Sequence, residues 1–425
     1  MSRENGHRPL AILMAADVDP VPPTSGAERV LHEYSARLAA RGHRTIVICR
    51  REDRLKPESE AIGGVQVHRY DVNSNGTLTF LRSAIQGGSD LCRQIVASEH
   101  INVINLHQPL AAEGVFRVRE ARNIPRIYTF LSPWSEEYHI RHPASAGIPA
   151  ALHHWANVTA RRLIERRCLH ACERVQVLSD YSYQHLAQIH RVPRSKVSII
   201  PGGVDTVRFA PVEDRIAPRR KLGIPPDALL LLTVRNLEPR MGVDALLDAM
   251  PTVCQARPEV HLVIGGSGPL TTHLQQRAAA LKIDEHVTFA GFIPEADLAS
   301  YYAAADLFVL PTRGLEGFGL VTVEAMACGT PVLGTPVGGT QEILRGFDES
   351  FLFSGTSAED LAEGILQHLP RIRGNQELRA RCRAYVEENY SWDVIIPRIE
   401  ALFYAAARGN AAPTHARNKA ECNQA

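Results

Sequence analysis

The chain has 425 residues, 45% of them hydrophobic, and a formal net charge of +1 at neutral pH. This length favours two domains over one, and the near-zero charge excludes a general electrostatic surface for nucleic acid. No apolar run approaches the ~20 residues that cross a bilayer, and residues 1–13 lack a signal peptide's apolar segment, so we predict a cytoplasmic protein. The eight scattered cysteines are predicted to be small core residues.

The first part of the chain alternates between predicted strands and helices. Residues 10–14 and 45–49 are strands, and between them Ser25 and Glu28 form a capping box that opens a helix ending near Ala40. This βαβ pattern is typical of a doubly wound domain. No G-x-G-x-x-G follows the first strand, which weakens a dinucleotide-binding interpretation.

Two further strands lead to candidate ligand contacts. Residues 101–106 precede His107, and residues 127–130 precede Trp134 and Glu137. Because ligands bind at the carboxyl ends of strands in open α/β sheets, we expect these three side chains to line the cleft of this domain. The alternatives are a structural role for His107 and a core-covering role for Trp134 and Glu137.

The next segment contains an arginine-rich helix. Residues 159–174 are predicted to be helical, with a polar side that carries Arg161, Arg162, Arg166 and Arg167. A solvated face is the default interpretation, and a weak contact with an anionic membrane at its inner face is the alternative. Strands at residues 175–178 and 198–200 follow, and residues 206–227, with four prolines, are predicted to be a linker.

The second half of the chain repeats the alternation. Five predicted strands separated by helices indicate a second parallel sheet, at residues 229–234, 260–264, 287–289, 307–310 and 331–333. Its glycine loops, at residues 265–268 and 338–339, each precede a helix. A last helix is predicted from Ser391 to about Ala407.

The stretch from Pro311 to Gly329 combines the signals of an anion-binding site. A buried strand precedes it, Gly317 and Gly319 lie in its loop, and a helix follows from Leu320. Such a junction offers unpaired amides at the positive end of a helix dipole, and its glycines let a phosphate approach the backbone. We therefore expect an anionic group to bind there.

Two carboxylates flank this loop. Glu324 lies among apolar residues in the middle of the predicted helix, where a buried charge without partners would be costly. Glu316 precedes the glycine loop and can face the same ligand. The alternative is structural, with Glu316 favouring the helix dipole and Glu324 pairing with a nearby arginine.

Residues 316–324, Glu-Gly-Phe-Gly-Leu-Val-Thr-Val-Glu, resemble the E-x7-E signature of the retaining glycosyltransferases of family 4. The resemblance covers nearly the whole chain and implies the GT-B fold, two Rossmann-like doubly wound α/β domains facing a central cleft. It implies that Glu324 holds the ribose hydroxyls of a nucleotide-sugar and that Glu316 lies against the donor sugar. The diphosphate is then expected on the backbone amides of Phe318, Gly319, Leu320 and Val321.

The resemblance also implies the domain organisation. Residues 1–205 are expected to form the acceptor domain and residues 206–390 the donor domain, with a helix at 391–408 crossing back to the first. Residues 409–425 are polar and predicted to be disordered. Gly26 matches the glycine loop that brings the first domain toward the donor phosphates, and Gly266 is expected on the donor side.

The segment from Arg235 to Gly242 departs from the family pattern R-L-x-x-x-K-G. Asn236 stands where the phosphate-binding arginine usually is, and Met241 where the lysine is. We expect Arg240 to replace the lysine and to stabilise the departing diphosphate, with Asn236 and Arg235 also on the donor side. Arg235 is the competing candidate for the cation that stabilises the departing diphosphate.

Two further positions in the sequence concern contact with the acceptor and the binding of a metal ion. Leu131 stands where the family usually has a histidine that contacts the sugar or acceptor, which leaves His107, Trp134 and Glu137 as the acceptor candidates. Asp17 and Asp19 form a D-x-D pair, the metal-holding signature of the other large glycosyltransferase fold. Here the pair ends the first strand, and we expect no metal.

The function that the resemblance implies is transfer of a sugar from a nucleoside-diphosphate-sugar to a hydroxyl, with retention. The acceptor is expected to be a saccharide, a lipid-linked molecule of the cell envelope or a small natural product. Neither a cofactor nor nucleic acid is expected, because a phosphorylase would need a pyridoxal phosphate lysine and the glycine loops contain none. A GT-B epimerase or phosphorylase and a nucleotide-sugar-binding protein without turnover remain alternatives.

Overall fold

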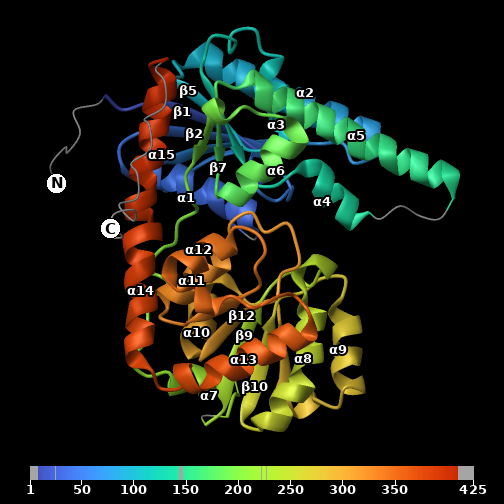
Figure 1. Ribbon diagram of the computed structural model, residues 1–425. Helices are drawn as coiled ribbons and strands as arrows, with labels where there is room; N and C mark the ends of the chain where they lie inside the picture. Colours follow the sequence, from blue (N-terminus) through green and yellow to red (C-terminus); the bar gives the residue numbers. More distant parts are fainter. Residues whose placement is uncertain (1–7, 24, 143–146, 222, 226, 410–425) are drawn as a thin grey trace, which may run out of the picture.

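The structure, a computed structural model, describes residues 8–409 except 24, 143–146, 222 and 226, and folds into two α/β domains (Figure 1). The prediction of disorder for the tail falls, from residue 410 on, outside the described residues. The two domains lie one above the other in Figure 1, with the long last helices running along one side of both.

The first domain is built on an eight-stranded sheet in the order β3-β4-β2-β1-β5-β6-β7-β8. Its strands are β1 Ala11–Ala15, β2 Arg44–Arg50, β3 Ser59–Ile62, β4 Val65–Tyr70, β5 Val103–Leu106, β6 Arg126–Phe130, β7 Arg174–Val177 and β8 Val197–Ile199. The ladders are parallel except that between β3 and β4. Parallel register brings the carboxyl ends of β1, β5 and β6 to one edge, which is the edge that holds ligands in open sheets.

Helices cover both faces of this sheet. They are α1 Gly26–Ala40, α2 Thr77–Ser98, α3 Pro109–Phe116, α4 Trp134–Arg141, α5 Ile148–Ala171 and α6 Asp180–His190. The predicted capping box is present, because Ser25 accepts from the Glu28 amide and Glu28 accepts from the Ser25 amide. The last helix, α15 Trp392–Ala407, packs Ile395, Ile399 and Phe403 into the core of this domain beside α1.

The second domain holds a five-stranded parallel sheet in the order β11-β10-β9-β12-β13. Its strands are β9 Leu229–Val234, β10 Val260–Gly265, β11 Val287–Gly291, β12 Leu307–Leu310 and β13 Val332–Gly334. Its helices are α8 Val243–Ala256, α9 Thr271–Ala280, α10 Glu295–Ala304, α11 Leu320–Ala327, α12 Thr340–Phe347, α13 Ala358–Ile372 and α14 Gln376–Tyr390, preceded by α7 Ile216–Lys221. The predicted fold class, two doubly wound parallel α/β domains, is therefore confirmed.

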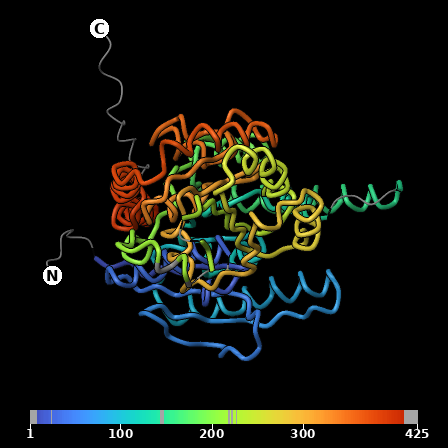
Figure 2. Tube along the Cα trace, turned by 90° about the horizontal axis from the view of Figure 1, so that it is seen from below, coloured from blue at the N-terminus to red at the C-terminus, as the bar shows by residue number. Residues whose placement is uncertain are grey.

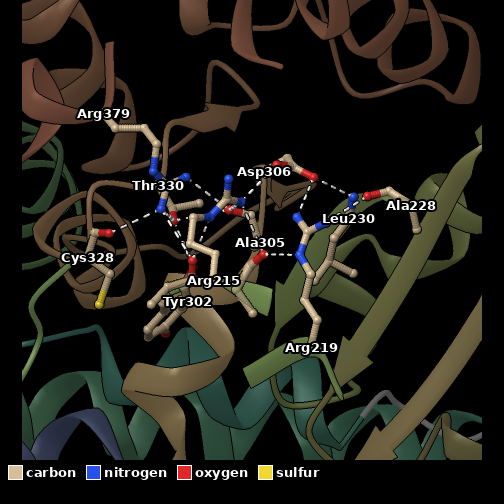
Figure 3. Close-up of polar contacts among 12 residues, drawn as sticks. Arg215, Arg219, Ala228, Leu230, Tyr302, Ala305, Asp306, Cys328, Thr330 and Arg379 are labelled. Atoms are coloured by element: carbon tan, nitrogen blue, oxygen red, sulfur yellow. Dashed lines mark hydrogen bonds and ion pairs between the residues drawn. The ribbon is translucent and has the colours of Figure 1, made fainter. Parts of the chain in front are cut away.

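A buried cluster of arginines secures the segment between the domains to the second sheet (Figure 3). The Asp306 carboxylate accepts from Arg215 and Arg219, each at 2.7 Å, and from the Leu230 amide at 2.8 Å. Arg379, on α14, donates to the carbonyl oxygen of Ala305 at 3.1 Å. Arg215 and Arg219 also donate to the Ala304 carbonyl oxygen. These carbonyls lie at the C-terminal end of α10, whose dipole adds negative charge and helps to explain why three guanidiniums gather beside Asp306.

We expect Asp306→Asn to lower the free energy of unfolding by about 3–5 kcal/mol, the scale for breaking one partner of a buried ion pair. Burial opposes ionisation of Asp306, but Arg215 and Arg219 outweigh it and lower its pKa. The stabilisation by the Asp306 ion pairs is therefore present at pH values above the ordinary aspartate pKa. It is lost as the pH falls through the pKa of Asp306 in the folded protein. Urea unfolding across that range measures both effects.

The matched control is Asp90→Asn, which makes the same change in the exposed pair between Asp90 and Arg93. Exposed pairs contribute at most about 1 kcal/mol, so this variant should unfold almost as the parent does. Equal losses in the two variants would show that the Asp306 cluster is not a specific stabiliser.

Two general features concern the helices and the cysteines of the described residues. None of their helices is long and apolar enough to cross a membrane. The seven cysteines among them are all buried as free thiols, as predicted for core residues.

Candidate functional site

The loop after β12 and the start of α11 form the centre of the site. Gly319 precedes the helix with φ +91°, and a Cβ there would lie 2.2 Å from the Thr340 hydroxyl. Only glycine fits this position without strain. The first helical amides, including those of Leu320 and Val321, have no acceptors within the helix, which makes its N-terminus an anion-binding end.

Arg235 contacts Glu316 directly. Its guanidinium donates to the Glu316 carboxylate, to the Thr312 hydroxyl at 3.1 Å and to the Met241 sulfur at 2.8 Å. Arg235 is buried at the end of β9, and the Glu316 side chain is 15% exposed. The pair therefore holds Glu316 in one orientation and offsets the buried charge of Arg235.

Arg240 reaches the same loop from a short 3-10 turn at Pro239–Met241. It donates to the Leu315 carbonyl oxygen at 3.0 Å and to the Glu238 carboxylate at 3.3 Å. Asn236, two positions before Glu238, is exposed. Both candidate cations thus lie beside residues 315–316, with Arg235 the more deeply buried of the two.

Glu324 is buried and has two protein partners. Arg29, on α1 of the first domain, donates to one carboxylate oxygen, and the Tyr302 hydroxyl donates to the other at 2.9 Å. Arg29 also pairs with Glu295 at 2.8 Å. Burial opposes the charge on Arg29, but Glu324 and Glu295 outweigh it and raise the pKa of that guanidinium. Glu324 therefore bridges the two domains.

The glycine loop also contacts the first domain. The Gly317 carbonyl oxygen accepts from the hydroxyls of Ser179 at 2.5 Å and Ser182 at 3.0 Å. A Cβ on Gly317 would lie 2.6 Å from the Leu131 carbonyl oxygen, so Leu131, where the family has histidine, lies against this loop. The Glu342 carboxylate, on α12, accepts from two amides at the N-terminus of α6.

Three of the predicted donor-side residues differ in their surroundings. Phe318 is buried, and a Cβ on Gly202 would lie 2.8 Å from its ring, so it packs between the domains. Gly266 has φ +114° and no room for a Cβ, which would lie 1.8 Å from the Arg235 carbonyl oxygen. Gly26 is exposed with open space around it, at the start of α1. Close backbone packing thus accounts for Gly266, whereas no contact among the described residues requires glycine at residue 26.

The predicted acceptor residues have hydrogen-bond partners within the first domain. His107 is buried beneath the carboxyl edge of the first sheet, where its Nε2 contacts the Asn105 side chain at 2.7 Å. Burial lowers the pKa of His107 to about 3, which keeps it neutral. Trp134 and Glu137 are half-buried on α4, where the Trp134 amide donates to Glu165 and Glu137 accepts from Ser132.

The D-x-D pair is divided between two environments. Asp19 is buried and accepts from Arg69 at 2.7 Å and from Lys56 at 2.8 Å. Asp17 accepts from the Leu110 amide, and burial raises its pKa to about 6. Among the described residues there is no group of three histidine, cysteine or acidic side chains placed to hold a metal.

A polar pocket of about 350 Å³ lies at the carboxyl ends of β2 and β4. Arg50, Arg51 and Arg54 line it together with Asp71 and Phe80. Arg51 pairs with Asp71, and Arg50 lies over the Phe80 ring at 5.5 Å. This pocket belongs to the same edge of the sheet as Asp17 and His107, and the sequence analysis did not find it.

Sequence reasoning also missed Arg29 and Tyr302. The burial of Glu324 indicated that the carboxylate needed partners, but not which residues they were. Arg29 follows the capping box by one residue and is almost 300 positions from Glu324, so only the domain contact brings them together.

Comparison with known proteins shows which family this chain belongs to. A family described as "Glycosyltransferase Family 4" matches residues 24–208, and one described as "Glycosyl transferases group 1" matches residues 214–389. A D-inositol 3-phosphate glycosyltransferase from Geodermatophilus obscurus is 30% identical over 322 residues, which cover 74% of this chain and 68% of that protein.

One further relative and one solved structure extend this result. A GDP-mannose-dependent monoacylated alpha-(1-6)-phosphatidylinositol monomannoside mannosyltransferase from Corynebacterium glutamicum is 35% identical over 217 residues, 49% of this chain and 56% of that protein. The aligned region is thus little more than half of that relative. A sucrose-phosphate synthase structure from Thermosynechococcus elongatus shares the fold, with TM-score 0.78, 23% identity and coverage of 95% of this chain and all of that one. The chain therefore belongs to glycosyltransferase family 4 and has the GT-B fold.

Proposed function

We propose that the protein transfers a sugar from a nucleoside-diphosphate-sugar to a hydroxyl acceptor, with retention, in the synthesis of cell-envelope polysaccharide or glycoconjugates. The observation that carries this proposal is the convergence of Glu316, Glu324 and the N-terminus of α11 at the contact between the domains. A diphosphate at that helix end would meet free amides, with Arg235 and Arg240 beside it.

The contacts of Glu316 support a positioning role for this residue. Its carboxylate is held by Arg235, a pairing that favours contact with the donor sugar over covalent attack. In the proposed step the acceptor oxygen bonds to the anomeric carbon on the face from which the diphosphate departs. The acceptor proton passes to a departing phosphate oxygen, so no protein base is needed.

The domain contact supports a closed reacting state. Ser179, Ser182 and Glu342 join the domains next to the glycine loop, and Glu324 binds Arg29 across the same contact. Closure around a bound donor would exclude water from the anomeric carbon and so limit hydrolysis.

We further infer that the acceptor carries an inositol phosphate. The name of the Geodermatophilus obscurus relative contains D-inositol 3-phosphate, and that of the Corynebacterium glutamicum relative contains a phosphatidylinositol monomannoside. Both molecules contain an inositol phosphate group. The pocket with Arg50, Arg51 and Arg54 lies on the acceptor domain and suits a phosphate through charge-assisted hydrogen bonds. GDP-mannose, named for the Corynebacterium glutamicum relative, is the first donor to test.

The decisive experiment measures release of nucleoside diphosphate. Thermal shift against a panel of nucleotide-sugars selects the donor, because a ligand at 100 times its Kd stabilises by ~2.7 kcal/mol. Diphosphate release from that donor should then require an acceptor, tested as D-inositol 3-phosphate and as phosphatidylinositol. Release without any acceptor would indicate a hydrolase or an epimerase, and binding without release would indicate the non-catalytic alternative that Leu131, Asn236 and Met241 keep open.

We also expect transfer to be independent of added metal. Phosphate charge can be met by the α11 N-terminus and Arg240, while Asp19 is already paired with Arg69 and Lys56. Activity should persist in the presence of a chelator, and Mn²⁺ or Mg²⁺ should raise it by less than about twofold, under roughly half a kcal/mol of barrier. Loss of transfer activity with a chelator, and recovery of that activity with either ion, would assign a metal-binding role to Asp17 and Asp19.

A further inference from the structure

Helix α5 projects from the first domain. Figure 1 shows its N-terminal part extending beyond the sheet at one side, and Figure 2 shows the same segment standing clear of the body in a perpendicular view. The buried residues of α5 are Glu165, Cys168 and Leu169, all in its last third. The first part of the helix therefore has little contact with the core.

The base of this projecting helix is firmly held. Glu165 contacts His190 at 3.0 Å and accepts from the Trp134 amide at 3.0 Å, both inside the domain. Arg161 lies over the Tyr138 ring at 3.7 Å and over the Trp134 ring at 5.1 Å, which joins α5 to α4. The helix is thus held at its base along one side, which leaves the opposite side exposed.

That opposite face is apolar over its first part. Ile148, Leu152, Trp155 and Leu163 are 77%, 61%, 65% and 59% exposed. Their spacing places them within about a quarter-turn of one another at 3.6 residues per turn, along roughly 22 Å of helix. They are four of the eleven large hydrophobic side chains that are exposed in the described part of the chain. Such a concentration on one helix indicates a contact surface.

The same face is basic over its last part. Arg162 and Arg166 fall in register with the apolar stripe, and the side chains of Arg162 and Arg167 are 46% and 67% exposed. The helix contains four arginines and one acidic residue, Glu165, which is buried. Glu136 and Glu113, on neighbouring helices, pair with Arg162 at 3.1 Å and Arg167 at 3.5 Å without covering either guanidinium.

We propose that the exposed face of α5 docks on an anionic lipid bilayer, with Leu152 and Trp155 at the acyl boundary and Arg162, Arg166 and Arg167 at the lipid phosphates. Tryptophan and leucine beside arginine are the composition of interfacial helices. A second copy of the same helix would bring its own arginines and no exposed acid to the contact, whereas anionic headgroups complement this charge. The contact lies outside the proposed transfer reaction and does not depend on it.

The test uses the full chain with two kinds of vesicle, one of phosphatidylcholine alone and one of equal phosphatidylcholine and phosphatidylglycerol. The protein should float with the anionic vesicles and not with the neutral ones, and added salt should weaken the association. Leu152→Ser with Trp155→Ser should reduce binding at least tenfold, as should Arg162→Ala with Arg166→Ala. Trp155→Phe should still bind but lose the blue shift of tryptophan emission on vesicle addition.

The matched control is Phe292→Ser, in the second domain, because Phe292 is 65% exposed like Trp155. This variant should bind anionic vesicles as the parent does. Every variant is checked for thermal stability and for nucleoside diphosphate binding, so loss of lipid binding is separated from misfolding and from failure of the donor site.

Absence of parental binding to anionic vesicles overturns the proposal, as does equal binding by the Leu152/Trp155 double variant. A dimer in solution that the same double variant dissociates would assign the face to a second copy instead, and also overturns it.

Discussion

Arg240→Ala is expected to lower turnover by about a hundredfold or more, the scale for removing one preorganised electrostatic contact from a transition state. Arg240 lies against the Leu315 carbonyl oxygen, next to Glu316, and its side chain is 17% exposed. Within the described part of the chain its guanidinium has one carboxylate partner, Glu238 at 3.3 Å, which leaves donors to face a departing diphosphate. Steady-state kinetics with saturating donor measures the loss.

Arg235→Ala distinguishes a catalytic cation from a structural one. Arg235 is buried and holds Glu316, so its removal leaves that carboxylate without its partner and should lower the melting temperature as well as the turnover. Arg240→Ala should leave the melting temperature nearly unchanged. Adding Glu316→Gln to Arg235→Ala should restore part of the stability but not the activity.

The alternative outcome is also informative. If Arg240→Ala changes turnover by less than about threefold, below roughly 1 kcal/mol of barrier, Arg240 is not the diphosphate contact. Arg235 then takes that role if Arg235→Ala lowers turnover by more than about threefold and adding Glu316→Gln does not restore the turnover. If neither arginine matters to turnover, the non-catalytic alternative gains support.

Met241→Lys is not expected to replace Arg240, although the family places a lysine there. The Met241 side chain is buried, and its sulfur accepts from Arg235 at 2.8 Å. An ammonium at this position would meet the Arg235 guanidinium at close range, which disfavours both charges.

Glu324→Gln is expected to weaken nucleoside diphosphate binding by at least tenfold while the protein remains folded. The proposed ribose contact needs a carboxylate that accepts hydrogen bonds from two hydroxyls, and an amide offers one acceptor oxygen in place of two. Tyr302 can still donate to the amide oxygen, and Arg29 keeps Glu295 as a partner, so the local packing should hold. Isothermal titration measures the affinity.

Glu295→Gln is the control within the same cluster. Glu295 also pairs with Arg29, but its side chain is 36% exposed on α10. If the effect of Glu324→Gln came only from disturbing Arg29, Glu295→Gln would reproduce part of it. Unchanged affinity in Glu295→Gln and reduced affinity in Glu324→Gln assigns the nucleotide contact to Glu324, whereas unchanged affinity in both would contradict it.

The position of Arg29 adds a consequence for domain closure. The carboxylate proposed to hold the ribose is bound to the first domain through this arginine. Donor binding must therefore share or replace that ion pair, so the donor affinity and the closure equilibrium are coupled.

The sequence alone determined the fold class and the central loop. Short apolar strands separated by helices are local patterns, and they located β9, β12 and the start of α11 within a residue or two. The Glu316 to Glu324 segment is also local, because one strand, one loop and one helix turn carry it. Burial of a lone carboxylate in an apolar helix is enough to indicate that Glu324 needs partners.

Neither β3 nor β4 was predicted. β4 does carry the period-two strand pattern, because Val65 and Val67 alternate with polar residues, whereas β3 is a short edge strand with half its residues exposed. Edge strands bury little, so their hydrophobic signal is weak.

Only the tertiary structure decided which residues surround the carboxylates. Arg29 reaches Glu324 from the other domain, and Arg235 reaches Glu316 because parallel strands β9 and β12 are neighbours in the sheet. The structure also buries His107 beside Asn105. Such contacts depend on the packing of segments far apart in the chain, and the spacing of residues along a sequence carries no record of which distant side chain faces which.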